Sequence, residues 1–403
     1  MHIASTQKLG QLTYCTNVHA GADWPDMITG LRRWVPQVKA AVCPDQSFGL
    51  GLRIAASAAQ SLTNGGKLSQ LQAFLDETEC HVFTINGFPY GPFHGASVKQ
   101  NVYAPDWQTE ERLTYTNALA DILAELLSDG MEGSISTVPG SFKAWSQGKE
   151  RDIAANILRH IAHLIDVKRR TGRTIRLALE PEPCCMLETI DETVDFFENQ
   201  LFTSDSVKLL ACSTGLGHGD AEATLRDLVS ICYDVCHAAV EYEDADLSIA
   251  QLRAAGIKVA KLQLSSALRI PCVSPETAHH LAPFNEPVYL HQVIARHPTA
   301  ANSTLKRFSD LPEAMADIDA FEGYEWRVHF HVPVFIERLT AFETTQPFLK
   351  RILALHRARP ISDHLEVETY TWDVLPDAYR GGDVATNMSR ELSWVLKELT
   401  SAD

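Results

Sequence analysis

Residues 149–180 read KERDIAANILRHIAHLIDVKRRTGRTIRLALE and contain the unit from which most of the chain is built. In the first part, Lys149–Thr171, apolar residues such as Ile153 and Ile157 recur three and four positions apart, which predicts an amphipathic helix. The second part, Ile175–Glu180, is a short apolar run typical of a buried strand. A helix followed directly by such a strand is typical of parallel β–α–β units.

The same alternation continues in both directions along the chain. We expect eight strands, at Leu12–Asn17, Phe48–Ile54, His81–Asn86, Gly133–Val138, Ile175–Glu180, Val229–Asp234, Ile257–Leu264 and His364–Glu368. We expect further helices at Asp26–Val42, Gly66–Glu79, Thr109–Ser128, Thr189–Leu201, Asp220–Leu228, Ser248–Ala255 and Thr345–Arg357. No GxGxxG sequence follows the first strand, which argues against a dinucleotide-binding sheet. The pattern therefore predicts an α/β protein with a closed (β/α)8 TIM barrel.

One segment breaks this alternation. From about Ser266 to Trp326 the chain is rich in Pro, His and polar residues, with a helix expected at Leu311–Phe321 and one further strand at Arg327–Phe335. This segment is too short for a core of its own, so we interpret residues 266–335 as an insertion between strands seven and eight. A terminal helix is expected at 384–400, and residues 1–403 are expected to form one barrel domain. Insertions at the carboxyl ends of barrel strands cover or line the active site.

The composition is that of a folded, acidic protein. Of 403 residues, 45% are hydrophobic and 21% charged, and the formal net charge is −16. Nucleic-acid binding normally needs a basic surface, and no basic cluster here is longer than Lys168–Arg170. These features exclude DNA, RNA and anionic membranes as expected partners. They do not exclude a small phosphorylated ligand, because a local pocket can be positive.

The sequence also bears on the compartment. Residues 1–10 lack a basic start followed by an apolar run, and no segment is long and apolar enough to span a bilayer. The 9 cysteines are scattered without paired-motif spacing, which is typical of free thiols in a reducing environment. We therefore expect a cytoplasmic protein without membrane insertion. The oligomeric state stays open, with a homo-oligomer as one alternative.

Polar side chains recur where the expected strands end. They are Asn17 and His19, Arg53, Asn86, Thr137, Glu180 with Glu182, Asp234 with His237, Gln263, and Glu366 with Glu368. A barrel brings the carboxyl ends of its strands to one face, so these side chains are expected to converge. Carboxylates within apolar strands are costly unless they are paired, protonated or bound to a cation. Glu182 precedes Pro183 and is interpreted as a loop residue.

The most informative local motif is Ile231-Cys-Tyr-Asp-Val-Cys-His237, where Asp234 and His237 end an apolar strand and can point at one cation. An Asp that caps the next helix, with a satisfied His nearby, is the alternative. Two or three carboxylates with an imidazole, and without a thiolate motif, suit Mn²⁺, Zn²⁺, Mg²⁺ or Co²⁺. The sequence therefore predicts a divalent metal ion of unresolved identity.

These residues carry a family resemblance. Glu180, the Asp234/His237 pair and a glutamate on the last strand resemble the xylose isomerase-like barrels, which include sugar isomerases, epimerases and endonuclease IV-like proteins. Longer motifs resemble the EboE-type metabolite traffic proteins over essentially the whole chain. They are Leu12-Thr-Tyr-Cys-Thr-Asn-Val-His19, Thr84-Ile-Asn-Gly-Phe-Pro-Tyr-Gly-Pro-Phe-His94, Gly133-Ser-Ile-Ser-Thr-Val-Pro-Gly-Ser-Phe-Lys143, Val328-His-Phe-His-Val-Pro333 and Leu365-Glu-Val-Glu-Thr-Tyr-Thr-Trp372. That family is named for an operon linked to traffic of a secondary metabolite or its precursor.

The resemblance implies roles for particular residues. Glu180, Asp234 and Glu368 would be metal ligands, with His237 near the metal or the substrate, and Glu180 and Glu368 would also be catalytic. Related epimerases have a His ligand on strand seven where this chain has Gln263, which offers a weaker oxygen ligand. His329 or His331, expected on one face of the inserted strand, is the alternative to it. Glu366 shares the strand face of Glu368 because side chains on one face recur every second residue.

The candidates for substrate binding are His19, Arg53, Asn86, His94, His329, His331 and Glu366. The rigid loop from Asn86 to His94 can form one wall of a polyol pocket, with His94 as a polar contact. Arg53 is expected to hold a substrate phosphate or carboxylate, or to pair with a site carboxylate, because Arg is seldom buried without an anion. His19 follows the first strand and belongs to the same group, whereas Lys143 is a weaker anion candidate.

The leading hypothesis is a metal-dependent isomerase or epimerase that acts on a sugar, a cyclitol or a related polyol, with or without a phosphate group. The alternative is a non-catalytic carrier of a sugar-like metabolite. A Schiff-base aldolase that uses Lys261 is a third hypothesis. A phosphodiesterase of the endonuclease IV type is least favoured, because the protein is acidic and a dense cluster of histidines is not expected.

Overall fold

The computed structural model describes residues 1–3, 8–64, 66–95, 97–298 and 304–401. Eight parallel strands form one sheet in the order β1-β13-β7-β6-β5-β4-β3-β2. Their bounds are β1 (Gln11–Tyr14), β2 (Phe48–Arg53), β3 (Cys80–Asn86), β4 (Gly133–Thr137), β5 (Ile175–Leu179), β6 (Val229–Asp234), β7 (Val259–Leu264) and β13 (His364–Val367). A parallel bridge between Cys15 and Gly51 brings the two outer strands together, so the barrel is nearly closed. The predicted (β/α)8 class is confirmed.

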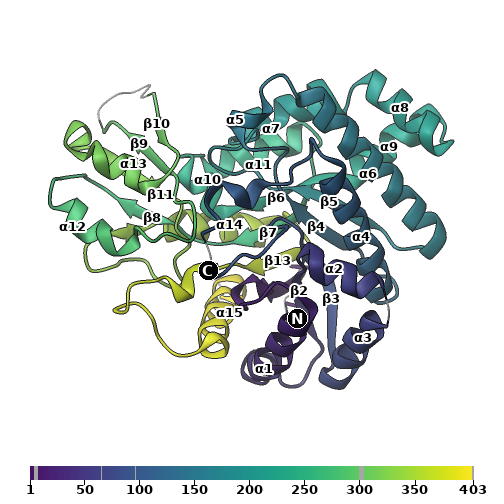
Figure 1. The fold of residues 1–403 in the computed structure, drawn as a ribbon, viewed down its shortest axis with the longest axis horizontal. Coiled ribbons are helices and arrows are strands. Elements are labelled where there is room, and N and C mark those ends of the chain that lie inside the picture. Colours follow the sequence, from purple (N-terminus) through teal and green to yellow (C-terminus); the bar gives the residue numbers. More distant parts are fainter. Residues whose placement is uncertain (4–7, 65, 96, 299–303, 402–403) are drawn as a thin grey trace.

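Helices surround the barrel, with α6, α8 and α9 on one side and α1, α3 and α15 on another (Figure 1). Their bounds are α1 (Trp24–Val42), α2 (Ala56–Thr63), α3 (Lys67–Thr78), α4 (Glu110–Leu126), α5 (Lys143–Ser146), α6 (Glu150–Thr171), α7 (Ile190–Phe196), α8 (Ser204–Thr214), α9 (His218–Leu228), α10 (Val235–Val240), α11 (Ala245–Ala254), α14 (Gln346–Ala358) and α15 (Val384–Thr400). Short helical turns lie at η1 (Thr16–Val18), η2 (Lys99–Tyr103), η3 (Phe197–Leu201) and η6 (Tyr370–Asp373).

Helix α6 shows how the sequence forms these elements. Its stripe of Ile153, Ile157 and Ile161 is fully buried. Acidic residues lie in its first turn and basic residues in its last, as the helix dipole favours. The helix ends at Gly172, whose φ of 73° is the left-handed conformation that glycine adopts without strain. The chain then enters β5, which is buried along nearly its whole length.

Several helices differ from the expected ones, and α2, α5 and α10 were not predicted. The predicted helix Thr189–Leu201 is α7 followed by the π-helical turn η3, and α8 was not predicted. Helix α9 begins at His218 rather than Asp220, because Gly217 is the last extended residue before it.

The insertion between β7 and β13 forms a second, antiparallel sheet beside the barrel (Figure 1). Its order is β10-β9-β11-β8-β12, formed by β8 (Leu268–Ile270), β9 (Val293–Arg296), β10 (Lys306–Phe308), β11 (Glu325–Val328) and β12 (Glu343–Thr344). The same region contains α12 (Thr277–Leu281), η4 (Ala282–Phe284), α13 (Leu311–Ala316) and η5 (Ile318–Phe321). Residues 299–303 of the predicted insertion lie outside the described residues.

The predicted strand Arg327–Phe335 is wrong beyond Val328. After β11 the chain bends toward the barrel mouth, where the Val332 amide donates to Ser266 O at 2.8 Å. The His331 ring donates to Glu368 O at 2.9 Å. These contacts replace the strand ladder, and Pro333 has no N–H with which to continue it. His329 and His331 therefore lie on a loop and not on a strand face.

Helix α15 links this loop to the segment after the last barrel strand through hydrogen bonds. Its Glu391, which is fully buried, accepts hydrogen bonds from Val334 N at 3.0 Å, Thr369 Oγ1 at 2.6 Å and Trp372 Nε1 at 3.2 Å. Burial raises the pKa of this carboxyl to about 7. The segments that it joins follow His331 and Glu368 directly, so this one side chain fixes the position of both.

We expect Glu391→Ala to lower the free energy of unfolding by about 3 kcal/mol, because three buried donors lose their acceptor. Urea unfolding followed by circular dichroism measures the change. Lys397→Ala, on an exposed turn of the same helix, is the control and should cost less than about 0.5 kcal/mol. Equal effects of the two substitutions would contradict the proposed role of Glu391 in holding these segments together.

The structure also bears on membrane-spanning segments and on the cysteines. Among the described residues, no helix combines the length and the apolar character needed to cross a membrane. All nine cysteines are free.

Candidate metal centre

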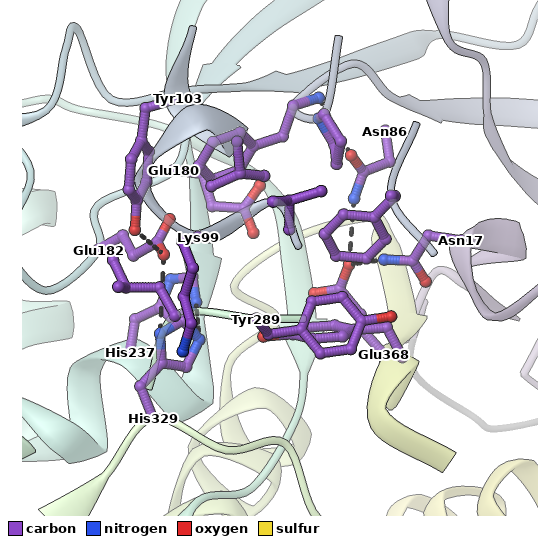
Figure 2. A pocket seen from close by; sticks show the side chains of 17 residues that line it. Asn17, Asn86, Lys99, Tyr103, Glu180, Glu182, His237, Tyr289, His329 and Glu368 are labelled. Carbon is purple, nitrogen blue, oxygen red and sulfur yellow. Dashed lines mark hydrogen bonds and ion pairs between the residues drawn. The ribbon is translucent and has the colours of Figure 1, made fainter. Parts of the chain in front are cut away.

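The candidate site is a cavity at the carboxyl ends of the barrel strands. Its lining combines polar side chains with aromatic and aliphatic ones. Figure 2 shows Glu180, Glu182, His237 and His329 on one side and Asn17, Asn86 and Glu368 opposite them. The insertion contributes His329 and Tyr289 to the lining, so it forms part of the site.

Three carboxylates converge at this mouth. Glu180 follows β5, Asp234 ends β6 and Glu368 follows β13, and each is at most 5% exposed. One carboxylate oxygen of each lies within 4.8 Å of the others. Asn17 and Asn86 each donate from Nδ2 to Glu368 Oε1, at 2.5 and 3.1 Å, and so fix the position of that carboxylate.

Burial and mutual repulsion disfavour the charged forms of these carboxylates. Burial, and then the charges of Glu368 and Asp234, raise the pKa of Glu180 well above its ordinary value. Burial, and then Asp234, raise the pKa of Glu368 to about 8. Carboxylates this close in a low-dielectric site hold protons or bind a cation. Glu180 Oε2 and Asp234 Oδ2 are buried without a hydrogen-bond partner.

Three histidines meet beside these carboxylates. The ring centroids of His237, His329 and His331 lie 4.6 to 5.8 Å apart. Each ring uses Nδ1 for a hydrogen bond to an acceptor: Pro181 O at 2.9 Å, Gln292 Oε1 at 2.7 Å and Glu368 O at 2.9 Å respectively. The Gln292 amide nitrogen donates to Tyr103 and to Pro183 O, so its oxygen must accept from His329. All three Nδ1 atoms therefore carry the proton.

The three Nε2 atoms consequently present lone pairs. His237 Nε2 lies 3.1 Å from His329 Nε2, and His331 Nε2 has no partner. Two lone pairs at that distance repel unless a proton or a cation lies between them. Burial lowers the pKa of His331 to about 4, and burial together with His237 lowers that of His329, so protonation is disfavoured at neutral pH. Imidazoles fixed through Nδ1, with Nε2 free, are arranged as metal ligands.

The donor atoms form overlapping groups. Asp234, His237 and His331 offer three atoms within 4.8 Å of one another, as do Glu182, His237 and His329. Asp234 also belongs to the carboxylate group formed with Glu180 and Glu368. Carboxylate and imidazole donors suit Zn²⁺, Mn²⁺ or Co²⁺, so the residues present fit a divalent cation.

This geometry corrects two expectations. A dense histidine cluster was not expected, yet His237, His329 and His331 form one. Glu182 does lie on a loop, as predicted, but it was not expected at the site: it lines the cavity, is 5% exposed and accepts the Tyr103 hydroxyl at 2.7 Å. Its other oxygen has no partner. Its neighbours Tyr103 and His329 are distant in sequence, so no local motif marked it.

Glu366 and Lys261 lie deeper in the barrel than Glu368. They form a fully buried ion pair that does not line the cavity. Although burial opposes it, the Glu366 carboxylate keeps the pKa of Lys261 above its ordinary value. A charged lysine shielded from the cavity is a poor Schiff-base nucleophile, which disfavours the aldolase hypothesis. Gly51 leaves room for this pair, since a Cβ there would overlap Glu366 Oε1.

The remaining predicted residues are divided between the cavity and its surroundings. Asn86 lines the cavity, and Gln263 pairs in register with Asp234, with its amide nitrogen lacking a hydrogen-bond partner. His94 does not line the cavity. Its ring nitrogens are hydrogen-bonded to Asn17 O and, at 2.7 Å, to the Tyr289 hydroxyl. The loop that carries His94 does contribute Phe88, Pro89 and Phe93 to the wall.

His19, Arg53 and Lys143 also lie outside this cavity. His19 and Arg53 line a second, smaller cavity, and Arg53 has no carboxylate within ion-pair distance in the described part of the chain. Lys143 pairs with Glu188 and with Glu192, so neither the cavity nor a free anion site includes it. None of these three residues lines the cavity that Glu180 and Glu368 line.

Part of the cavity wall beside the donor atoms is aromatic, and the ring centroid of Tyr370 lies 4.6 Å from that of His331. Phe93, Tyr289 and Tyr370 form a triangle with ring centroids 4.9 to 5.1 Å apart. Lys99 holds the loop beside it to the insertion through an ion pair with Asp310 at 2.7 Å. A ligand in this cavity would contact both polar donor atoms and flat aromatic rings.

Searches with the sequence found no matching family model and no matching curated protein. The solved structures similar to the chain include a probable 3-DHS dehydratase AsbF involved in petrobactin synthesis from Bacillus anthracis, with 15% identity, a TM-score of 0.45, and 95% of this chain and 97% of that chain covered. Another is the IOLI protein with a binding zinc atom, with 11% identity, a TM-score of 0.47 and coverage of 97% and 100%. A third is a xylose isomerase domain containing protein from Salmonella typhimurium, with 10% identity, a TM-score of 0.41 and coverage of 99% and 100%.

Each of these TM-scores is below 0.5. The likenesses therefore identify no family or activity for this chain. The barrel class follows from the strand order of the structure, and any function must be argued from the site.

Proposed function

We propose that this chain is a cytoplasmic, divalent-metal-dependent isomerase or epimerase that acts on a sugar, a cyclitol or a related polyol. The observation that carries the proposal is the convergence of three carboxylates and three imidazoles whose free donor atoms point at one another. The resemblance of the sequence to the EboE-type proteins supports a role in the traffic of a secondary-metabolite precursor.

Glu180, Asp234, His237 and Glu368 would hold the cation, and Glu182, His329 and His331 offer alternative donors from the overlapping groups. When bound, a divalent cation polarises a carbonyl or hydroxyl oxygen and so acidifies the adjacent C–H bond. Gln263 is a further proposed metal ligand. Its register beside Asp234 supports this role.

Glu180 and Glu368 are the proposed proton carriers. They come from β5 and β13, which are separated in the barrel by β6 and β7, so a ligand between them would meet a carboxylate on each side. Asn17 and Asn86 occupy Glu368 Oε1, which leaves its second oxygen to receive or deliver a proton. The aromatic wall of Phe93, Tyr289 and Tyr370 would exclude water and contact the C–H face of a polyol ring.

The alternative is a carrier that binds the same ligand without turnover. The presence of Gln263 where related epimerases have a His supports this alternative. The two functions differ in one observable, because only an enzyme that abstracts a carbon-bound proton exchanges it with solvent.

The test is solvent exchange. We expect metal-loaded protein in D₂O to incorporate deuterium at carbon into at least one member of a panel of ketoses, aldoses and inosose-type cyclitols, detected by mass spectrometry. Glu180→Gln and Glu368→Gln should each lower the rate at least about 100-fold, because a positioned acid or base contributes that much. Full exchange in both variants would refute the assigned roles. A ligand that binds the native protein without any exchange would establish the carrier.

A further inference from the structure

A second cavity lies on the other side of η1 from the candidate metal centre. Asn17 lines the metal cavity, whereas its neighbours Thr16 and His19 line the second one together with Arg53. No Asp or Glu lines this second cavity among the described residues. It is therefore a small chamber with a cationic side chain and no acidic one, within a protein of net charge −16.

Arg53 is buried there without a counterion. Its side chain belongs to a residue that is 6% exposed, and it makes no ion pair with a carboxylate in the described part of the chain. Two of its five N–H groups are used: Nη1 donates to Gly21 O at 3.0 Å and Nη2 donates to Gly91 O. Its Nε–H is buried without a partner. A desolvated guanidinium with a free donor is costly unless an anion completes it.

Arg112 shows what a purely structural buried arginine looks like in this protein. It is fully buried and also lacks an acidic partner. However, all three of its nitrogens donate to backbone oxygens, those of Pro105, Gly87 and Phe88, at 2.7 to 3.0 Å. Arg53 differs from Arg112 in two ways. Its Nε has no hydrogen-bond partner, and its side chain lines a cavity.

The start of helix α2 adds further donors. Ala55 and Ala58 line the cavity, and the helix begins at Ala56 with no side-chain cap on its first turn. The Ala56 N–H already donates to Tyr90 O at 2.9 Å, which leaves those of Ser57 and Ala58. Free N–H groups in a first turn favour a negative charge. The free edge of Arg53 and this helix start therefore border the same chamber.

We propose that this chamber binds a small oxyanion, a carboxylate or a phosphate group, through Arg53 Nε and the first turn of α2. The anion has two conceivable sources with the same chemistry. It is either a free inorganic or organic anion, or the acidic group of the ligand whose remaining part fills the metal cavity. The second source rests on the proposed function, whereas the anion site itself does not.

The test uses the full-length protein with its metal content measured in every sample. Isothermal titration at constant ionic strength, balanced with chloride, compares inorganic phosphate, acetate, gluconate and glucose 6-phosphate. Arg53→Gln is expected to weaken binding at least tenfold without changing the metal content. Arg32→Gln, which removes an exposed arginine paired with Glu77, is the matched control and should leave binding unchanged.

The outcomes separate the sources. Binding of phosphate or acetate that Arg53→Gln removes supports a free anion. Binding of only gluconate or glucose 6-phosphate, again lost in Arg53→Gln while metal is retained, supports the acidic group of a larger ligand. Absence of binding by the native protein, or equal binding by Arg53→Gln, would overturn the proposal. If Arg53→Gln does not fold, NMR of the native protein provides the test. The Nε–H resonance of Arg53 is assigned as the one missing from the spectrum of Arg53→Lys, and added phosphate is expected to shift it.

Discussion

Replacing Asp234 by Asn should lower the affinity for divalent metal by about 100-fold or more, since loss of even a supporting residue typically costs 10- to 100-fold. Asp234 belongs to both the carboxylate group and the group with His237 and His331. Its Oδ1 accepts from Ser265 at 2.7 Å and from the His237 amide at 3.0 Å, and an Asn oxygen can keep both bonds. Its unpartnered Oδ2 would become an N–H donor that repels a cation.

Competition with a fluorescent chelator measures this affinity for Zn²⁺ and Mn²⁺. Glu243→Gln is a matched control, because Glu243 is a nearby, half-buried carboxylate that accepts the Ile190 amide and lies outside the donor groups. It should bind metal as the native protein does. Equal affinities of native protein and the Asp234→Asn variant would show that the carboxylates do not hold the ion.

The second large effect concerns pH. In metal-free protein the pKa of Glu368 is raised to about 8, above the ordinary value of 4.5, and that of Glu180 is raised too. The folded state then holds more protons than the unfolded state, so its stability falls as pH rises through the raised pKa. A bound cation replaces those protons. The difference in Tm between metal-loaded and metal-free protein should therefore widen by several degrees from pH 7 to pH 9.

Differential scanning calorimetry at matched ionic strength tests this expectation. His331, whose pKa is lowered to about 4, changes charge below this window and does not interfere. Glu391 and Glu241 also have raised pKa values, but they lie outside the donor groups and affect both forms equally. Glu368→Gln should reduce the widening. A Tm difference that is constant or shrinks toward pH 9 would contradict the described electrostatics.

The barrel itself could be predicted because its pattern is local. Each strand is a short apolar run, and each following helix repeats apolar residues on one face, as Ile153, Ile157 and Ile161 do. All eight predicted strands coincide with observed ones to within three residues at either end. Asp234 was marked by its place at the end of such a run. The structure shows the capping role, because Asp234 is the N-cap of α10, and the metal-ligand role stays a proposal.

The insertion and the histidine cluster could not be predicted in this way. Strands of three or four residues, such as β8 and β11, are too short to show alternation, and the second sheet is formed by pairing across long connections. His329 and His331 reach the site because the chain leaves β11 at Val328. The Nδ1 acceptors that orient the rings are backbone oxygens and Gln292, which the sequence does not reveal.

The most direct test of the proposed metal centre is anomalous diffraction from crystals of protein purified without chelator, measured on both sides of the absorption edges of Zn, Mn and Co. We expect a peak within bonding distance of Asp234 Oδ2 and His331 Nε2, two of the buried site atoms that lack hydrogen-bond partners. No peak at any edge, even after soaking with Mn²⁺ or Zn²⁺, with ordered water bonded to those atoms instead, would contradict the metal centre.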